Sequence, residues 1–225
     1  MTTVLTSITG GKDALSEGQP NGHFIAYLDT PQESKSWQVK VLPHIFADPR
    51  RNSRLPKMLS HLYSDTEYAI WIDGNITLTK SPQELVDRYL KDKDIALFKH
   101  PKRDCLYGEA TRCATGKLDD PEVIIEQVKR YEDSGFAKNK GLWECGVIIR
   151  RHSPKVIEFN NYWFSEYCRG SVRDQISFPY SADAVGLRIE TIEAPWYLHE
   201  NGRDVIRSDF IRMVPHTILN PQLNG

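Results

Sequence analysis

The stretch that decides the fold is YAIWIDGNITL, residues 68–78. Its first five residues are apolar or aromatic, which is typical of a buried strand. The run ends in Asp73, Gly74 and Asn75. Asp-Gly and Gly-Asn are common turn dipeptides, but two oxygen-bearing side chains around a glycine also suit a hard cation and a phosphate. This stretch alone leaves a turn and a binding site open.

The composition indicates an ordinary soluble protein. The chain has 225 residues, of which 40% are hydrophobic and 26% charged, and we expect one domain over residues 1–225. The net charge of -1 gives no strong nucleic-acid signal. No apolar run approaches the roughly 20 residues that span a bilayer, and the N-terminus has no signal-peptide pattern. The four cysteines form no CxxC pair, which favours reduced thiols in a cytoplasmic protein and leaves one or two disulfides open.

Strands and helices are expected to alternate along the chain. Three helices are predicted from a Ser or Asp cap followed by proline, at Ser81, Asp120 and Ser153. Strands are expected at residues 4–9, 24–28, 68–72, 95–98 and 146–149, with an edge strand within 188–192. We therefore predict an α/β fold whose central sheet is mixed, mostly parallel and flanked by helices. In such sheets ligands bind beyond the carboxyl ends of the strands, where Asp73 is expected.

The segment DPRRNSRLPK, residues 48–57, concentrates positive charge in Arg50, Arg51, Arg54 and Lys57. Arginine forks pair well with phosphate oxygens, so the segment suits a diphosphate. A solvated basic face is the alternative interpretation.

A second basic segment, FKHPKRDC at residues 98–105, follows a predicted strand directly. Lys99, His100, Lys102 and Arg103 are expected in a loop at the strand end, where function is often found. The alternative is a basic surface loop.

Two carboxylates suit acid–base chemistry. Glu144, beside Trp143 in GLWECGVIIRR, lies at the mouth of an apolar strand, where it suits a base or a sugar hydroxyl. Its alternative is an exposed residue at the strand entry. Asp174, followed by Gln175 in RGSVRDQISFPY, is either the N-cap of a helix starting at Gln175 or a substrate contact at a cleft.

Four blocks of the chain resemble a known family. YAIWIDGNITL, ALFKHPKRDC, GLWECGVIIRR and CRGSVRDQISFPY are similar to the signature blocks of the TOD1/MUCI70 glycosyltransferase-like family, from about residue 50 to about residue 180. That family is in turn similar to GT-A glycosyltransferases. The resemblance implies a GT-A-like fold, with a nucleotide-sugar half over about 1–100 and an acceptor-side half over about 101–225.

The resemblance also implies a metal site. Asp73, Gly74 and Asn75 fall at the position of the family's DxD motif, with Asn75 in place of the second aspartate. Dependence on Mn²⁺ or Mg²⁺ is therefore left open. Either His199 or His216 resembles the late histidine ligand, and we prefer His199 because HENGR looks like a loop that closes over phosphates.

Donor contacts follow from the same resemblance. Thr6, Gly10 and Lys12 fall where the first strand and its loop touch the nucleotide. Arg54 and Lys57 are expected to stabilise the leaving diphosphate.

On the acceptor or sugar side, the resemblance places the catalytic candidates Asp174 and Glu144. A carboxylate base within reach of the acceptor implies inversion, whereas its absence favours retention, to which the similar group leans. The remaining expected residues are Lys99, His100, Lys102, Arg103, Trp143 and Gln175.

The expected function is a glycosyltransferase, moving a hexose or pentose from a nucleoside diphosphate sugar to an acceptor hydroxyl. Two alternatives are kept: a metal-dependent hydrolase resembling the ceramidase described in the family, and a catalytically silent nucleotide-sugar-binding domain. The sugar, the base and the class of acceptor are left open.

Overall fold

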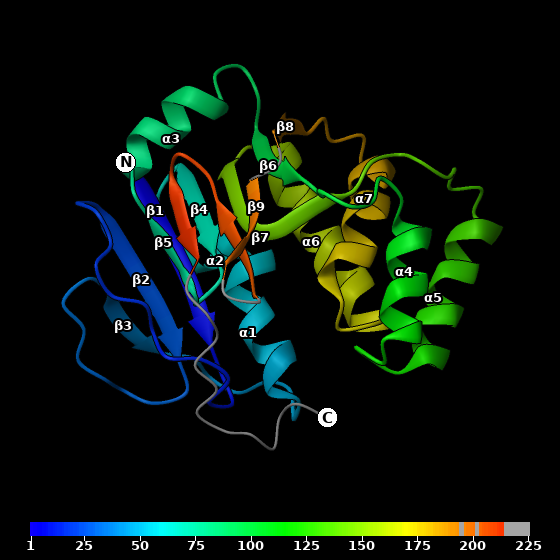
Figure 1. Ribbon diagram of the computed structural model, residues 1–225, viewed down its shortest axis with the longest axis horizontal. Helices are drawn as coiled ribbons and strands as arrows, with labels where there is room; N and C mark the ends of the chain where they lie inside the picture. Colours follow the sequence, from blue (N-terminus) through cyan, green and yellow to red (C-terminus); the bar gives the residue numbers. More distant parts are fainter. Residues whose placement is uncertain (194–195, 201–202, 214–225) are drawn as a thin grey trace.

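Figure 1 shows the computed structural model of the chain, in which a twisted sheet lies between helices. The structure describes residues 1–193, 196–200 and 203–213, with the backbone alone at 196–200 and 203–207.

The central sheet has seven strands in the order β3-β2-β1-β4-β7-β6-β8. Strand β7 is antiparallel to both of its neighbours, and the other neighbouring pairs are parallel. The predicted mixed, mostly parallel α/β sheet is therefore confirmed, and the segment 188–192 does contribute an edge strand. The strands are β1 (Thr2–Ile8), β2 (His23–Leu28), β3 (Gln38–Val41), β4 (Tyr68–Ile72), β6 (Ile95–Lys99), β7 (Trp143–Arg151) and β8 (Glu190–Ile192).

A second sheet, which the sequence patterns did not predict, has the order β5-β11-β10-β9 and is antiparallel throughout. Its strands are β5 (Ile76–Leu78), β9 (Trp196–Glu200), β10 (Arg203–Arg207) and β11 (Ile211–Met213). Strand β5 starts directly after the turn that follows β4, so the two sheets are joined at this turn.

Seven helices are present in the described part of the chain: α1 (Pro49–Met58), α2 (Ser60–Tyr63), α3 (Pro82–Tyr89), α4 (Leu106–Thr115), α5 (Pro121–Asp133), α6 (Pro154–Arg169) and α7 (Asp174–Ala184). The three predicted caps are confirmed, because the side chains of Ser81, Asp120 and Ser153 accept hydrogen bonds from amides in the first turns of α3, α5 and α6.

Helix α1 was missed at the level of sequence. It contains Pro56, and a proline inside a helix removes a hydrogen bond and disfavours the helical prediction. The start of α1 nevertheless carries clear signals. The Asp48 side chain accepts a hydrogen bond from the Arg50 amide at 2.8 Å, and Pro49 occupies the first turn.

The core occupies both faces of the central sheet. One face packs against α6 and α7, where Phe159, Trp163 and Tyr167 are fully buried. The other face packs against α3 and the second sheet, with Leu85 and Phe210 buried there. A smaller apolar cluster holds α4 and α5 against α7, at one side of the molecule in Figure 1.

All four cysteines are free thiols, which is the state that the sequence favoured over one or two disulfides. In the portion of the chain that the structure describes, no helix has the length and apolar character needed to cross a membrane.

The burial of Ile148 in the central strand β7 predicts a large loss of stability on truncation. Ile148 is 0% exposed, so Ile148→Ala leaves a cavity and should lower the free energy of unfolding by about 2–5 kcal/mol in urea denaturation. The matched control is Ile125→Ala on α5, where the side chain is 57% exposed and we expect a change within about 0.5 kcal/mol. Equal effects of the two substitutions would contradict this assignment of the core.

Candidate functional site

A cleft of about 200 Å³ lies at the carboxyl ends of the parallel strands β1 and β4. Its walls come from the loop after β1, the turn after β4, helix α1 and the residue before α7. Five of the predicted donor-side residues line it: Lys12, Arg54, Asp73, Gly74 and Asn75. The structure therefore brings together residues that lie far apart in the sequence.

Helix α1 supplies two of the four cationic side chains that line this cleft. Arg50 and Arg54 are four residues apart, so they share a helix face, and both line the cleft. Arg51 points elsewhere and donates to two carbonyls at the C-terminal end of α6, each at 3.0 Å. Of the four basic residues in this segment, two line the cleft, Arg51 caps a neighbouring helix, and Lys57 is buried.

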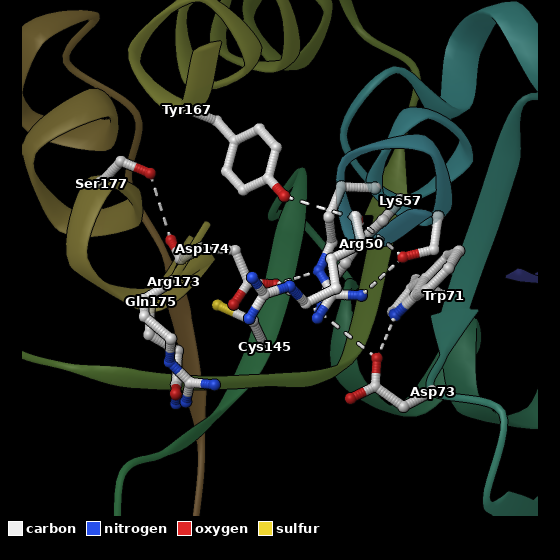
Figure 2. Close-up of polar contacts among 12 residues, drawn as sticks. Arg50, Lys57, Trp71, Asp73, Cys145, Tyr167, Arg173, Asp174, Gln175 and Ser177 are labelled. Atoms are coloured by element: carbon white, nitrogen blue, oxygen red, sulfur yellow. Dashed lines mark hydrogen bonds and ion pairs between the residues drawn. The ribbon is translucent and has the colours of Figure 1, made fainter. Parts of the chain in front are cut away.

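Lys57 is buried rather than part of the cleft lining. Its Nζ lies 2.6 Å from Asp174 Oδ2 and 3.3 Å from Asp73 Oδ1, and its side chain is only 2% exposed. The indole Nε1 of Trp71 donates to the same Asp73 oxygen at 2.8 Å. Figure 2 shows Lys57 between the two carboxylates, so its ammonium joins α1, the end of β4 and α7.

Asp174 is the counter-ion of the site. It is 6% exposed and lies 3.2 Å from the Nε of Arg54 as well as close to Lys57. Burial alone would raise the pKa of Asp174, but Lys57 and Arg54 outweigh it and hold this pKa well below its ordinary value. The reciprocal effect of Asp174 and Asp73 overcomes desolvation and raises the pKa of Arg54.

Two expectations for Asp174 change as a result. The N-cap interpretation is wrong, because Arg173 occupies that position and no side chain there caps the helix. A carboxylate with so low an affinity for protons is also a poor general base. The structure instead gives Asp174 the role of holding Arg54 at the cleft wall.

Asp73, Gly74 and Asn75 form a turn at the end of β4, and this turn also lines the cleft. The Ile76 amide donates to the Asp73 carbonyl at 2.9 Å, which closes the turn. A Cβ at Gly74 would lie 2.6 Å from the Ile8 side chain, so a larger residue here would require that side chain to move. The Asp73 side chain is 37% exposed, whereas Asn75 is 3% exposed.

Two further residues expected on the donor side lie off the cleft lining. Thr6 is fully buried, and its hydroxyl makes no hydrogen bond with the described residues. The amide of Gly10 donates to Asp29 Oδ2 at 2.5 Å, which fixes the loop after β1.

A second polar cluster gathers three residues expected on the acceptor side: His100, Glu144 and Gln175. The Gln175 side chain donates to Glu144 Oε2 at 3.2 Å. The Nε2 of His100 lies 3.6 Å from Glu144 Oε1 and 3.7 Å from Glu109. Burial, with Glu109 opposing it, lowers the pKa of His100, which favours a neutral imidazole.

The other residues expected on the acceptor side contact neighbouring residues of the protein or lie on its surface. The Nδ1 of His100 accepts from the amides of Lys102 and Arg103, so the basic loop folds around the imidazole. Arg103 pairs with Glu109 at 2.5 Å. The Trp143 indole donates to Thr191 at 3.1 Å, and Lys99 is exposed.

The predicted histidine ligands lie at the limit of the described structure. His199 is in strand β9, with its backbone paired to Asp204, so the interpretation of HENGR as a loop is wrong at this residue. The side chain of His199 and the whole of His216 lie outside the described residues. No three His, Cys, Asp or Glu side chains within the described set group together as metal ligands. The set of Asp73, Asn75 and His199 stays a prediction.

Arg50 was named only as part of the basic segment, and the cleft residues that were not singled out from the sequence are Ser7, Ile8, Thr9, Asp13, Ser53 and Arg173. Ser53 lies three residues after Arg50, so helical spacing would have placed the two on one face if α1 had been recognised. The only local signal for Arg173 in the sequence is its position directly before Asp174, which was a candidate site residue.

A model of the TOD1/MUCI70, glycosyltransferase-like domain matches residues 26–208. Probable hexosyltransferase MUCI70 of Arabidopsis thaliana is 32% identical over 174 residues, which cover 72% of this chain and 30% of that protein. Alkaline ceramidase TOD1 of the same plant is 25% identical over 185 residues, covering 75% of this chain and 40% of that protein. The chain therefore spans well under half the length of these curated relatives.

Three solved glycosyltransferases are also similar to the chain. The bifunctional glycosyltransferase WbbM has a TM-score of 0.48 at 10% identity, covering 84% of this chain and 38% of its own. Mouse xyloside xylosyltransferase 1 has a TM-score of 0.45 at 10% identity, with coverage of 85% and 84%. The galactosyltransferase LgtC has a TM-score of 0.42 at 9% identity, with coverage of 87% and 73%. At TM-scores below 0.5 these likenesses carry no argument about function.

The ion pairs of Asp174 predict stability that is sensitive to acid. Because the folded-state pKa is depressed, the stabilisation is complete above the unfolded pKa of about 3.9 and is lost as the pH falls towards the folded value. Asp174→Asn should cost about 3–5 kcal/mol of unfolding free energy at neutral pH and flatten its decline below about pH 4. Urea denaturation across this range measures both effects.

The matched control is Asp183→Asn on the same helix, where the side chain is 52% exposed. We expect this control to keep the acid-dependent decline of the unmodified chain. An Asp174→Asn variant with an unchanged decline would exclude Asp174 as its source.

Proposed function

The chain belongs to the TOD1/MUCI70 glycosyltransferase-like family, and on that premise we propose that it transfers a sugar from a nucleoside diphosphate sugar to an acceptor hydroxyl. The observation that carries the proposal is the cleft at the ends of β1 and β4, in which four cationic side chains meet: Lys12, Arg50, Arg54 and Arg173. Nucleotides bind at such strand ends in open α/β sheets, and arginine pairs with phosphate through two parallel hydrogen bonds.

The proposed reaction uses this charge on the leaving group. The acceptor oxygen attacks the anomeric carbon, the bond from that carbon to the diphosphate breaks, and negative charge builds on the departing diphosphate. Fixed cations stabilise such charge best when they need no reorganisation. Arg54 fits this role because Asp174 holds it in place from behind, with Nε 3.2 Å from the carboxylate.

Retention of anomeric configuration is the proposed outcome. Asp174, one of two candidate bases, is paired with two cations and is unsuited to taking a proton. The other candidate, Glu144, receives a hydrogen bond from Gln175 and is not among the residues that line the cleft. The acceptor's proton would then pass to the leaving diphosphate on the same face of the sugar. The anomeric configuration of the product, read by proton NMR, tests this, and an inverted product contradicts it.

A panel of nucleoside diphosphate sugars tests the proposed function. We expect at least one to raise the Tm of the protein and to release nucleoside diphosphate, slowly without acceptor and faster with one. Binding without release indicates the catalytically silent alternative, and release of fatty acid from ceramide indicates the hydrolase alternative. The absence of stabilisation by every nucleotide sugar would remove the transferase proposal.

Arg54→Gln should lower kcat/KM by about 10²–10³, because it removes one fixed donor to the developing charge. The matched control is Arg112→Gln on α4, an exposed arginine outside the cleft, which should leave kcat/KM within about twofold. Circular dichroism of both variants checks that they fold. Equal rates for Arg54→Gln and the control would exclude Arg54 from the site.

A further inference from the structure

The turn at Asp73 fits a divalent metal poorly. One of the Asp73 oxygens, Oδ1, is already contacted by Lys57 at 3.3 Å and by the Trp71 indole at 2.8 Å. The second position of the motif is Asn75, whose amide oxygen carries no formal charge and whose residue is 3% exposed. Mg²⁺ and similar ions require several oxygens in strict geometry, usually including one or two carboxylates.

Lys57 cannot easily give way to a metal ion. Its side chain is 2% exposed, and its ammonium lies 2.6 Å from Asp174, which is itself buried. Moving Lys57 would leave Asp174 with Arg54 alone, and buried charges that lose a partner are strongly destabilised. A divalent ion on Asp73 would also be repelled by this ammonium in surroundings that screen charge less than water does.

The cleft already has an excess of positive charge. Lys12, Arg50, Arg54 and Arg173 line it, against the carboxylates of Asp13 and Asp73. Two further carboxylates pair with these cations: Asp48 with Arg50, and Asp174 with both Arg54 and the buried Lys57. With Lys57, Asp48 and Asp174 included, five cations still meet four carboxylates. Desolvation, followed by the charges of the three arginines, lowers the pKa of Lys12, as expected where the local potential is positive. This potential attracts a diphosphate without the help of an added ion.

We propose that these four side chains neutralise the donor's diphosphate in place of a divalent metal. The proposal rests on the transferase function and replaces the metal dependence expected from the motif. The side chain of the remaining predicted ligand, His199, lies outside the described residues, so a His199 variant is part of the test.

The test uses inorganic pyrophosphate as the probe and isothermal titration calorimetry on the full chain in EDTA. We expect saturable binding without metal, weakened by rising salt because the contacts are ionic. Lys12→Gln should weaken it by about tenfold or more, because one charged contact is lost. Lys12 is exposed, so this substitution leaves the core intact. The matched control Lys129→Gln, an exposed lysine on α5, and the variant His199→Ala should both bind within about twofold of the unmodified chain.

Pyrophosphate binding that is absent in EDTA and restored by Mn²⁺ would overturn the proposal. So would a loss of binding in His199→Ala as large as that in Lys12→Gln. The transferase function is tested separately from the metal-free site. If pyrophosphate binds in EDTA but no nucleotide sugar binds, the metal-free diphosphate site is supported and the transferase function is contradicted. If nucleotide-sugar turnover stops in EDTA and returns with Mn²⁺, the function stands and the metal-free proposal fails.

Discussion

The buried ammonium of Lys57 is the interaction on which the site depends. A charge that is removed from water must find partners, and here the partners are Asp174 on α7 and Asp73 after β4. The three elements are therefore fixed relative to one another by one side chain. Arg54, one helical turn before Lys57, is thereby placed against Asp174 at the cleft wall.

The charge in the cleft differs strongly from the net charge of the whole chain. The chain as a whole has a net charge of -1, yet four cations line a single cleft. They come from the loop after β1, from two positions on α1 and from the residue before α7. No one segment carries the site, so the positive potential is a product of the fold, and it would attract an anion such as a phosphate group.

Local signals explain what could be predicted from the sequence. The bounds of β4 and the caps of α3, α5 and α6 depend on neighbouring residues, and they were predicted correctly. Helix α1 was missed because Pro56 argues against it locally, while its packing favours it. The burial of Lys57 could not be predicted, because it depends on Asp174 from a distant helix. The family was predicted from the resemblance of four sequence blocks, and the family match to residues 26–208 confirms that prediction.

The direction of β7 has a consequence for modularity. This strand comes from the second half of the sequence, yet it pairs with β4 on one side and β6 on the other, both from the first half. Because it runs opposite to them, its beginning lies beside the end of β4, and the Asp73 amide donates to the carbonyl of Gly146 at 2.9 Å. The two expected halves, about 1–100 and about 101–225, therefore share one hydrogen-bonded sheet. Replacing either half with that of a relative would require the pairs of β7 with β4 and β6 to form again across the new junction.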